Sequence, residues 1–430
     1  MKRALIALTI TVAGLAATAT SLLATSAAAP RAHRAATSDP SPDPVIQWNR
    51  TLLALQGTPG NQPPTVHPTY DLAIMHAAIY DAVVAIDHSG RPYLVNTHGA
   101  RQASLPAAVD AAAHDTLVAL YPGLQATIDQ DYADLLAQVP DGVRKLQGVH
   151  VGRVVARQLL KARAGDGSDA TLIPFTPGDQ PGDYQLTPPS FSQPVFTHWP
   201  FVRPFGLRSA DQFRPAPPPA LSSTAYADAI NEVKSVGVAS GSTRTPDQTQ
   251  IGQFWSPGIW IFWNQIAQAA ALGHGSSLSE DARTFALLNL TVADSIIASY
   301  EAKYTYALWR PITAIRAADT DGNPATTADP SWTPLVNTPP DPSYPGAHSL
   351  VSSAAAPVLE SVYGDHFQFS VTSSTLPGVQ RSFSSFSDAA LEAGLSRIYA
   401  GVHSRLDHVS GQELGTGVAG WDIAHLFAGR

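Results

Sequence analysis

Apolar residues recur with helical periodicity along most of the chain. Between Asp71 and Ile86, small and apolar residues fall on nearly every helical face, as in a helix that is buried on all sides. Periodicity of the same kind predicts further helices over 104–120, 124–138, 142–164, 222–236, 247–272, 278–308, 347–363, 386–400 and 404–427. No segment alternates with a period of two for long enough to predict a sheet, and no internal repeat is evident. The pattern therefore predicts an all-α protein.

One long segment interrupts the helical pattern. Residues 165–220 are rich in Pro, Gly and Asp, and aromatic side chains are scattered among them. Structureless loops of this length are uncommon inside a compact domain, so we predict an ordered connection that lies over the helices. A second loop, rich in Pro, Asp, Gly and Thr, fills about 318–345. We divide the chain into an N-terminal helical part (45–220), which includes the connection, and a C-terminal helical bundle (221–430).

The N-terminus has the features of an export signal. Lys2 and Arg3 precede an apolar stretch at 4–23, and the small residues of 25–29 offer a cleavage site. A membrane anchor is the alternative, but Thr and Gly dilute the apolar stretch. We predict a signal peptide at 1–29, a disordered leader at 30–44 and a secreted, extracellular mature protein without stable membrane insertion.

Composition excludes several classes of function. The 430 residues include no cysteine, which excludes disulfides, thiolate catalysis and cysteine-based metal sites. The formal net charge is −8, and no basic stripe offers a surface for a nucleic-acid backbone. We therefore expect no nucleic-acid partner.

Three segments in the C-terminal bundle carry candidate chemistry. In the first, Arg310 follows Lys303 by seven positions, about two helical turns, so both cations are expected on one helix face. Such a pair alone is typical of a solvated face. Two nearby cations without an intervening acid, however, suit an oxyanion better than a salt bridge.

The other two segments each contribute a histidine. Tyr344-Pro345-Gly346-Ala347-His348-Ser349 stands where a loop turns into a helix, and a helix N-terminus directs N–H groups at negative charge. The stretch from Ser396 to His403 adds a third cation, Arg397. Asp407 lies four residues after His403, so it is placed to accept the distal ring N–H and fix the tautomer of that histidine. An ordinary surface role for this aspartate is the alternative.

Taken in order, the three segments resemble the signature of the vanadium haloperoxidases and type 2 phosphatidic acid phosphatases. Lys-x6-Arg-Pro and Ser-Arg-x5-His match it residue for residue. The usual middle part, Pro-Ser-Gly-His, is Pro-Gly-Ala-His here, so Gly346 replaces a serine and removes one hydroxyl donor. The length of the chain and its N-terminal half, including Trp48-Asn49 and the helix from His76 to Val83, resemble the secreted bacterial haloperoxidase-like branch.

The resemblance implies a fold of helical bundles and a vanadate cofactor, whose place phosphate can take because both are tetrahedral oxyanions. His403 would be the protein ligand of vanadium, and His348 would accept a proton from hydrogen peroxide while a halide or small organic substrate is oxidised. The residues implied to surround the oxyanion are Lys303, Arg310, Gly346, Ala347, Arg397 and His403.

Two other functions remain open from the sequence. In an acid phosphatase, His403 would attack a phosphomonoester as nucleophile and His348 would protonate the leaving group. A non-catalytic anion-binding helical protein is the third possibility. In addition, Asp341 occupies the position, seven residues before His348, where the haloperoxidases commonly have an aromatic or histidine residue beside the halide. An ionised carboxylate there is expected to repel chloride, which favours bromide, iodide or an organic substrate.

Overall fold

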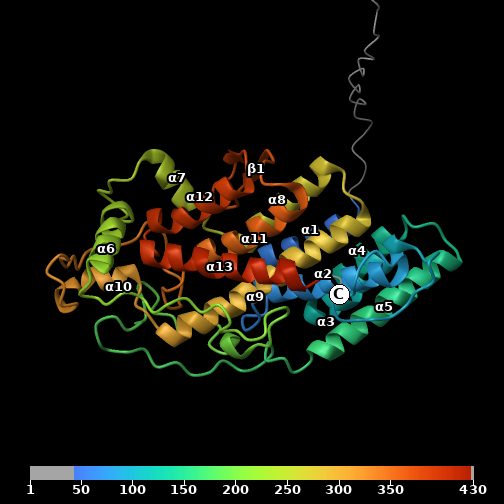
Figure 1. The fold of residues 1–430 in the computed structure, drawn as a ribbon, viewed down its shortest axis with the longest axis horizontal. Coiled ribbons are helices and arrows are strands. Elements are labelled where there is room, and N and C mark those ends of the chain that lie inside the picture. The colour runs from blue at the N-terminus through green and yellow to red at the C-terminus, as the bar shows by residue number, and fades with distance from the viewer. Residues whose placement is uncertain (1–42, 428–430) are drawn as a thin grey trace, which may run out of the picture. The chain divides into compact units, whose positions relative to one another are not determined.

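Thirteen α-helices and one short hairpin form the regular structure of residues 43–427, the part of the chain that the computed structural model describes, apart from three 3-10 turns (Figure 1). The all-α prediction is confirmed. The first helices are α1 (Pro44–Gly57), α2 (Pro68–Asp87), α3 (Leu105–Leu120), α4 (Gln125–Leu136), α5 (Val143–Arg163) and α6 (Thr224–Val236). The others are α7 (Pro246–Phe254), α8 (Ile259–His274), α9 (Leu278–Tyr306), α10 (Pro311–Arg316), α11 (Ala347–Tyr363), α12 (Phe386–Tyr399) and α13 (Arg405–His425).

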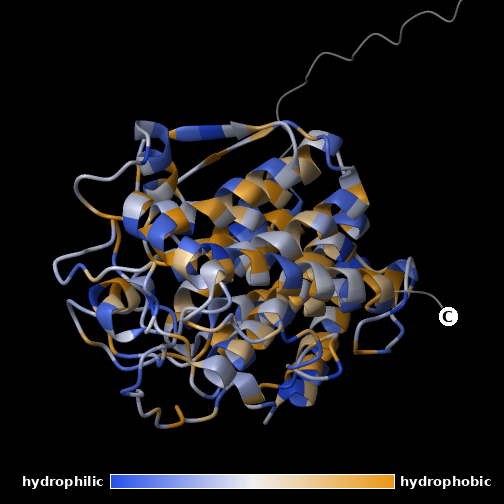
Figure 2. Ribbon diagram, turned by 60° about the vertical axis from the view of Figure 1, so that its left-hand side comes forward, coloured by the Kyte–Doolittle hydropathy of each residue, from blue (hydrophilic) through white to orange (hydrophobic). Residues whose placement is uncertain are grey.

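The core is built around two buried helices, α2 and α9. From Thr69 to Ile86 every residue of α2 is buried, which confirms the buried helix predicted from its apolar faces. By length and composition α2 could cross a membrane, but its apolar stretch lies wholly inside the protein. The longer helix α9 begins with a capping box between Ser277 and Glu280. Figure 2 shows hydrophobic residues gathered where the helices face one another and hydrophilic residues on the outer loops.

Helices α3 and α5 pack unusually closely in the first half of the chain. A Cβ atom at Gly148 or Gly152 of α5 would collide with the backbone oxygens of Ser104 and Ala108, at the start of α3. Only glycine lets the two backbones approach in this way.

Helices α11 and α13 repeat the same contact in the second half. A Cβ atom at Gly411 or Gly415 of α13 would collide with the backbone oxygens of Gly346 and Leu350. In both halves the glycines are four residues apart, and they meet a helix N-cap and the residue four positions later. The two contacts are therefore equivalent.

The buried polar residues of the first half of the chain also correspond to those of the second half. Asn49 of α1 and Asn264 of α8 each follow a buried tryptophan, and Asn49 donates to Asn264 at 2.8 Å. Asn49 also bonds to His76 of α2 at 2.8 Å, as Asn264 does to Asn289 of α9 at 2.9 Å. The structure thus contains an internal duplication, α1–α5 and α8–α13, that we did not detect in the sequence.

A buried aspartate of each central helix holds a loop. Asp81 of α2 accepts hydrogen bonds from the three consecutive N–H groups of 93–95, at 2.5 to 3.0 Å. Five residues after Asn289, Asp294 of α9 does the same for 205–207, at 2.6 to 3.0 Å. The second loop belongs to the 165–220 connection, whose Tyr184 and Trp199 are buried. This segment is therefore an ordered covering, as predicted.

Three local predictions were wrong. The helix predicted over 247–272 is broken between α7 and α8, because Pro257 disfavours a helical conformation in the residue before it. The helix predicted to 308 ends at Tyr306, where Ala307 adopts a left-handed conformation with φ 43°. Finally, a hairpin of β1 (Phe369–Thr372) and β2 (Gln380–Phe383), paired antiparallel, escaped notice because its strands are too short to show periodicity.

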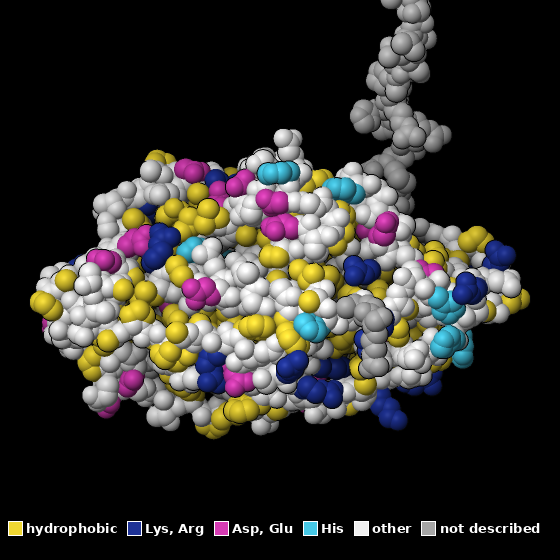
Figure 3. Space-filling view, viewed as in Figure 1, with side chains coloured by type: hydrophobic (Ala, Val, Ile, Leu, Met, Phe, Trp, Pro, Cys, Tyr) yellow, Lys and Arg dark blue, Asp and Glu magenta, His cyan; other side chains and the backbone are white. Residues whose placement is uncertain are grey.

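The predicted signal peptide and almost all of the predicted leader lie outside the described residues. The boundary at 220 stays a prediction. On the face drawn in Figure 3, most acidic side chains lie in the upper and left parts, and several basic side chains lie close together at the lower right.

Candidate active site

One cavity of about 300 Å³ brings together the charged residues of all three signature segments. It lies between the C-terminal half of α9, the break between α7 and α8, the N-terminus of α11 and the end of α12. Its charged and titratable lining consists of His67, Lys303, Arg310, Asp341, His348, Arg397 and His403.

Lys303 and Arg310 do not share one helix face as the sequence suggested. Lys303 is in the last turn of α9, whereas Arg310 is the N-cap of α10, beyond the left-handed Ala307. Both cations nevertheless reach the cavity, and both are buried.

Both cations form salt bridges, although no acid stands between them in the sequence. Asp341 comes from the loop before α11 and pairs with Lys303 Nζ at 2.9 Å and with Arg310 Nη2 at 2.6 Å. Lys303 Nζ donates in addition to the backbone oxygens of Pro342 and Ser343. The carboxylate that we expected to repel a halide is therefore already neutralised by two cations.

His348 lies in the first turn of α11 and faces the cavity. Its Nε2 is 2.8 Å from the backbone oxygen of Trp255, at the break between α7 and α8. Because a carbonyl oxygen only accepts, Nε2 carries the proton and Nδ1 keeps its lone pair. The helix break that the sequence did not predict thus sets the tautomer of this histidine.

Gly346 does not direct its N–H group at the cavity. This N–H donates to the backbone oxygen of Asp407 at 2.8 Å, and Gly346 is not among the residues that line the cavity, whereas Ala347 is. The two neighbouring hydroxyls that could replace the missing serine are also engaged. Ser343 Oγ donates to Asp407 at 2.8 Å, and Ser349 Oγ bonds to His408 at 2.8 Å.

Arg397 is the exception among the three cations. It is 5% exposed, and its Nη1 has no hydrogen-bond partner among residues 43–427. No ion pair of this guanidinium occurs within that range either. A buried, unpaired guanidinium beside a cavity is unusual, because burying a charge without a partner is costly.

His403 is held by Asp407 in a defined orientation. Its Nδ1 is 3.3 Å from Asp407 Oδ2, so Nδ1 donates and Nε2 keeps its lone pair. Nε2 accepts a hydrogen bond from Arg310 Nη1 at 3.2 Å. Helix α13 begins at Arg405, so His403 lies before the helix that carries Asp407. Asp407 completes a capping box with Ser404, which brings its carboxylate back to the histidine.

Burial is the main cause of the pKa shifts in the cavity. It lowers the pKa of His403 to about 3 and that of His348 well below 6.5, with smaller contributions from Arg310 and Arg397 respectively. Burial lowers the pKa of Lys303 to about 8. It would raise the pKa of Asp341, but Lys303 and Arg310 outweigh it and hold that pKa at about 2.

The other half of the cavity is largely aromatic and apolar, and sequence reasoning missed it. This half is lined by His67, Trp260, Ser299 and Tyr300. Trp260 Nε1 and Ser299 Oγ are buried without a partner among the described residues. Ser299 precedes Lys303 by one helical turn, so helical periodicity could have indicated it, whereas no local signal connects His67 or Trp260 with the site.

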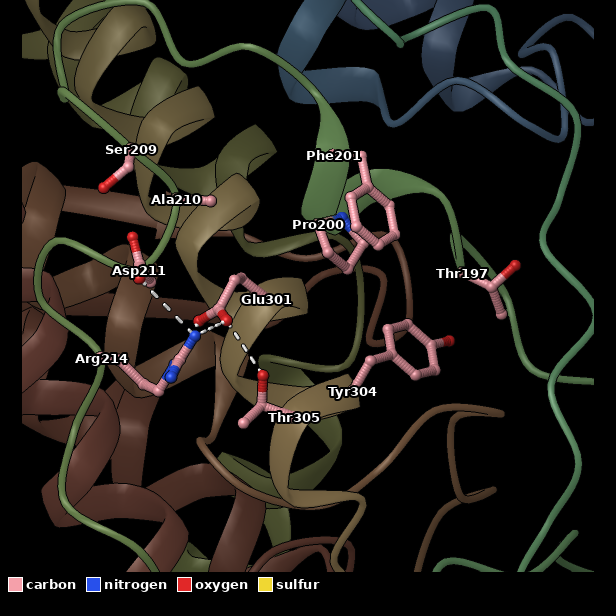
Figure 4. Close-up of a pocket in the computed structure, with 10 residues that line it drawn as sticks. All are labelled: Thr197, Pro200, Phe201, Ser209, Ala210, Asp211, Arg214, Glu301, Tyr304 and Thr305. Carbon is pink, nitrogen blue, oxygen red and sulfur yellow. Dashed lines mark hydrogen bonds and ion pairs between the residues drawn. The ribbon is translucent and has the colours of Figure 1, made fainter.

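A larger cavity, of about 430 Å³, lies on the other side of α9 and contains none of the signature residues (Figure 4). Arg214 points at its centre but is paired there with Glu301, with Nε to Oε2 at 2.9 Å. Thr305 donates to the same carboxylate at 2.9 Å. Because its charges satisfy one another, this cavity offers no comparable catalytic arrangement. Among the described residues no group of three or more His, Cys, Asp and Glu could hold a metal ion by itself.

Comparison with known proteins gives one match to the last third of the chain and others to most of its length. Residues 283–428 match the family model of the VCPO second helical-bundle domain. Vanadium chloroperoxidase of Curvularia inaequalis is 26% identical over 495 aligned positions, which cover 86% of this chain and 80% of that protein.

Solved structures of similar fold include the first bacterial vanadium-dependent iodoperoxidase, with a TM-score of 0.73, 26% identity and coverage of 88% of this chain and 94% of that one. A bacterial vanadium-dependent chloroperoxidase in its holo form has a TM-score of 0.69, 16% identity and coverage of 89% and 96%. At 16% identity the second structure supports the fold alone.

Proposed function

Since this chain belongs to the vanadium haloperoxidase superfamily, we propose that it is a haloperoxidase that uses hydrogen peroxide to oxidise a halide at a vanadate bound by His403. The observation that carries the proposal is the juxtaposition of two groups in one cavity. Arg397 is a buried cation without a partner among the described residues, and His403 has a neutral, oriented nitrogen lone pair.

These residues fit a tetrahedral oxyanion of a metal. The lone pair on His403 Nε2 accepts from Arg310 here and would exchange that hydrogen bond for a bond to vanadium, and Arg397 suits a bond to an oxyanion oxygen. Lys303 and Arg310 border the same space and add positive charge. When bound, vanadate supplies a Lewis acid that activates peroxide without a change in its own oxidation state.

His348 is the proposed acid–base group. Its Nε2–H is committed to the backbone oxygen of Trp255, so its Nδ1 lone pair is the site that takes up a proton. A strongly lowered pKa keeps the ring neutral in the absence of an anion. A nearby oxyanion would raise that pKa and so favour proton uptake.

We place the halide in the aromatic half of the cavity. Trp260 Nε1 and Ser299 Oγ are unused donors there, and aromatic ring edges carry partial positive charge. Neutral donors and ring edges suit large, weakly hydrated halides. We therefore favour bromide or iodide over chloride, and a small organic substrate that receives oxygen directly is the alternative.

The test is vanadate loading followed by two parallel assays, peroxide-dependent bromination and hydrolysis of a phosphomonoester. We expect bromination only, and its loss in His403→Ala together with vanadate binding. His150→Ala, which removes an exposed histidine of α5, is the matched control and should behave as wild type. Hydrolysis without bromination would favour the phosphatase alternative, which uses the same two histidines. Neither activity, with anion binding intact, would favour a non-catalytic protein.

Secretion is proposed on the N-terminal sequence alone. The basic start and the apolar stretch at 4–23 support export. Mass spectrometry of the protein from the culture medium should find a new N-terminus near Ala29, and retention of residues 1–29 in that protein would contradict cleavage.

A further inference from the structure

Asp341 already brings negative charge to two of the cations that would surround a bound anion. Its two carboxylate oxygens contact Lys303 Nζ and Arg310 Nη2, at 2.9 and 2.6 Å. The carboxylate is 6% exposed and lines the same cavity as both cations. With a pKa held at about 2, it stays ionised throughout the working range of the protein.

Asp341 therefore offsets part of the positive charge around the cavity. Lys303, Arg310 and Arg397 contribute three cations to its lining, and Asp341 is the one carboxylate among the lining residues. Lys303 and Arg310 share this carboxylate, whereas Arg397 has no counter-charge in contact with it among the described residues.

We propose that Asp341 makes the oxyanion site selective for singly charged tetrahedral anions. Because Lys303 and Arg310 already share the Asp341 carboxylate, one negative charge finds its counter-charge in Arg397, whereas a second would be buried without compensation, which is costly in a low-dielectric interior. At neutral pH orthovanadate carries mainly one negative charge, phosphate carries between one and two, and sulfate carries two. Asp341 thus favours vanadate over phosphate as occupant of one and the same site.

This inference rests on the proposed oxyanion site, and binding measurements test it without turnover. Perrhenate and sulfate are suitable probes, because they are tetrahedral and carry one and two charges at every working pH. Dissociation constants are measured by calorimetry for wild type, Asp341→Asn and the control Asp141→Asn. The control removes the same charge from a carboxylate whose side chain is 97% exposed.

We expect wild type and Asp141→Asn to prefer perrhenate, and Asp341→Asn to bind sulfate relatively more tightly. The ratio of the two dissociation constants should change by roughly tenfold or more, because a full charge is removed within a few ångströms of the anion. The two anions differ in hydration free energy, but this difference is the same for every protein variant and cancels when the ratios of the variants are compared. An unchanged ratio in a folded Asp341→Asn would overturn the role of Asp341 alone.

Asp341→Asn leaves Lys303 and Arg310 buried without their acid, so a second variant guards against loss of folding. Asp341→Asn combined with Lys303→Met restores the net charge, and it should return the ratio to the wild-type value. A double variant that keeps the ratio of the single variant would contradict a charge effect. Tighter binding of sulfate than of perrhenate by wild type would overturn the inference directly. If no protein binds vanadate or either probe, the oxyanion site itself is wrong.

Discussion

Arg397 should stabilise the protein only when an anion is bound. Burial lowers the pKa of its guanidinium from 12.5 to about 10, and one pKa unit corresponds to about 1.4 kcal/mol. The charged form is thus disfavoured by about 3 kcal/mol relative to water, and no ion pair within residues 43–427 offsets this. The anion-free protein therefore tolerates an uncompensated charge next to its candidate catalytic histidines.

The informative substitution is Arg397→Met, which keeps much of the side-chain volume and removes the charge. Replacement of buried ionic groups by apolar ones of similar size often stabilises a protein by about 1–4 kcal/mol. We expect the anion-free variant to melt a few degrees above wild type. Vanadate binding should weaken by roughly ten- to a hundredfold, the effect of one lost charge-assisted hydrogen bond of about 1.5–3 kcal/mol.

The assay combines calorimetric melting with vanadate titration in a buffer free of phosphate, sulfate and vanadate. Arg157→Met is the matched control, since Arg157 is exposed on α5 and should leave the affinity for vanadate unchanged. A lower melting temperature for anion-free Arg397→Met would refute the reasoning, because it would mean that the guanidinium stabilises the empty fold. Unchanged vanadate affinity would refute the assignment of Arg397 to the anion.

Three further predictions concern other parts of the structure. Gly346→Ser and Gly346→Ala should both lower stability by about 1 kcal/mol, because the new Cβ would lie 3.0 Å from the backbone oxygen of Asp407. Tighter vanadate binding by the serine variant than by the alanine variant would show that the hydroxyl reaches the anion after all. Ser299→Ala should raise KM for bromide several-fold and leave the vanadate dissociation constant unchanged, whereas a parallel loss of both would contradict a separate halide position. Burial and Asp43 raise the pKa of Asp281 to about 8, so the folded state keeps a proton that the unfolded state loses above about pH 4. Stability should fall as pH rises from about 4 to 8, by up to about 1.4 kcal/mol per pH unit from this group, and Asp281→Asn should remove that part of the slope in pH-dependent denaturation.

Helical periodicity predicted most of the fold because the pattern of buried residues in each helix is visible within that one segment of the sequence. Helices α3, α5 and α11 begin and end within one or two residues of the predicted positions, since their apolar residues and boundaries are local signals. The end of α9 at Tyr306 was missed because the left-handed Ala307 leaves no mark in the sequence. The duplication was missed because it consists of a few small and polar residues that matter only across a helix contact.

The signature segments identified the residues that lie together in the cavity, but not the ion pairs and hydrogen bonds that these residues form. The resemblance to the family signature predicted that His348, Arg397 and His403 lie close together, and all three line one cavity in the structure. The pairing of Asp341 with both other cations depends on how the loop before α11 folds back, which no spacing indicates. The proposed roles of these residues stay predictions until the variants are measured.

The duplicated helix pairs indicate how a structural element becomes a binding site. At the start of α3 the N-cap is Ser104, whose hydroxyl accepts from the N–H of Ala107, so the first turn is satisfied within the helix. The equivalent N-cap of α11 is Gly346, which offers no side-chain cap, and the first turn of α11 carries Ala347 and His348 on the wall of the cavity. Helix N-termini favour negative charge, so in the proposed site the uncapped turn and Arg397 would both favour an anion. The two halves thus differ at this point: Ser104 caps the start of α3 through its hydroxyl, whereas Gly346 leaves the first turn of α11 without a side-chain cap.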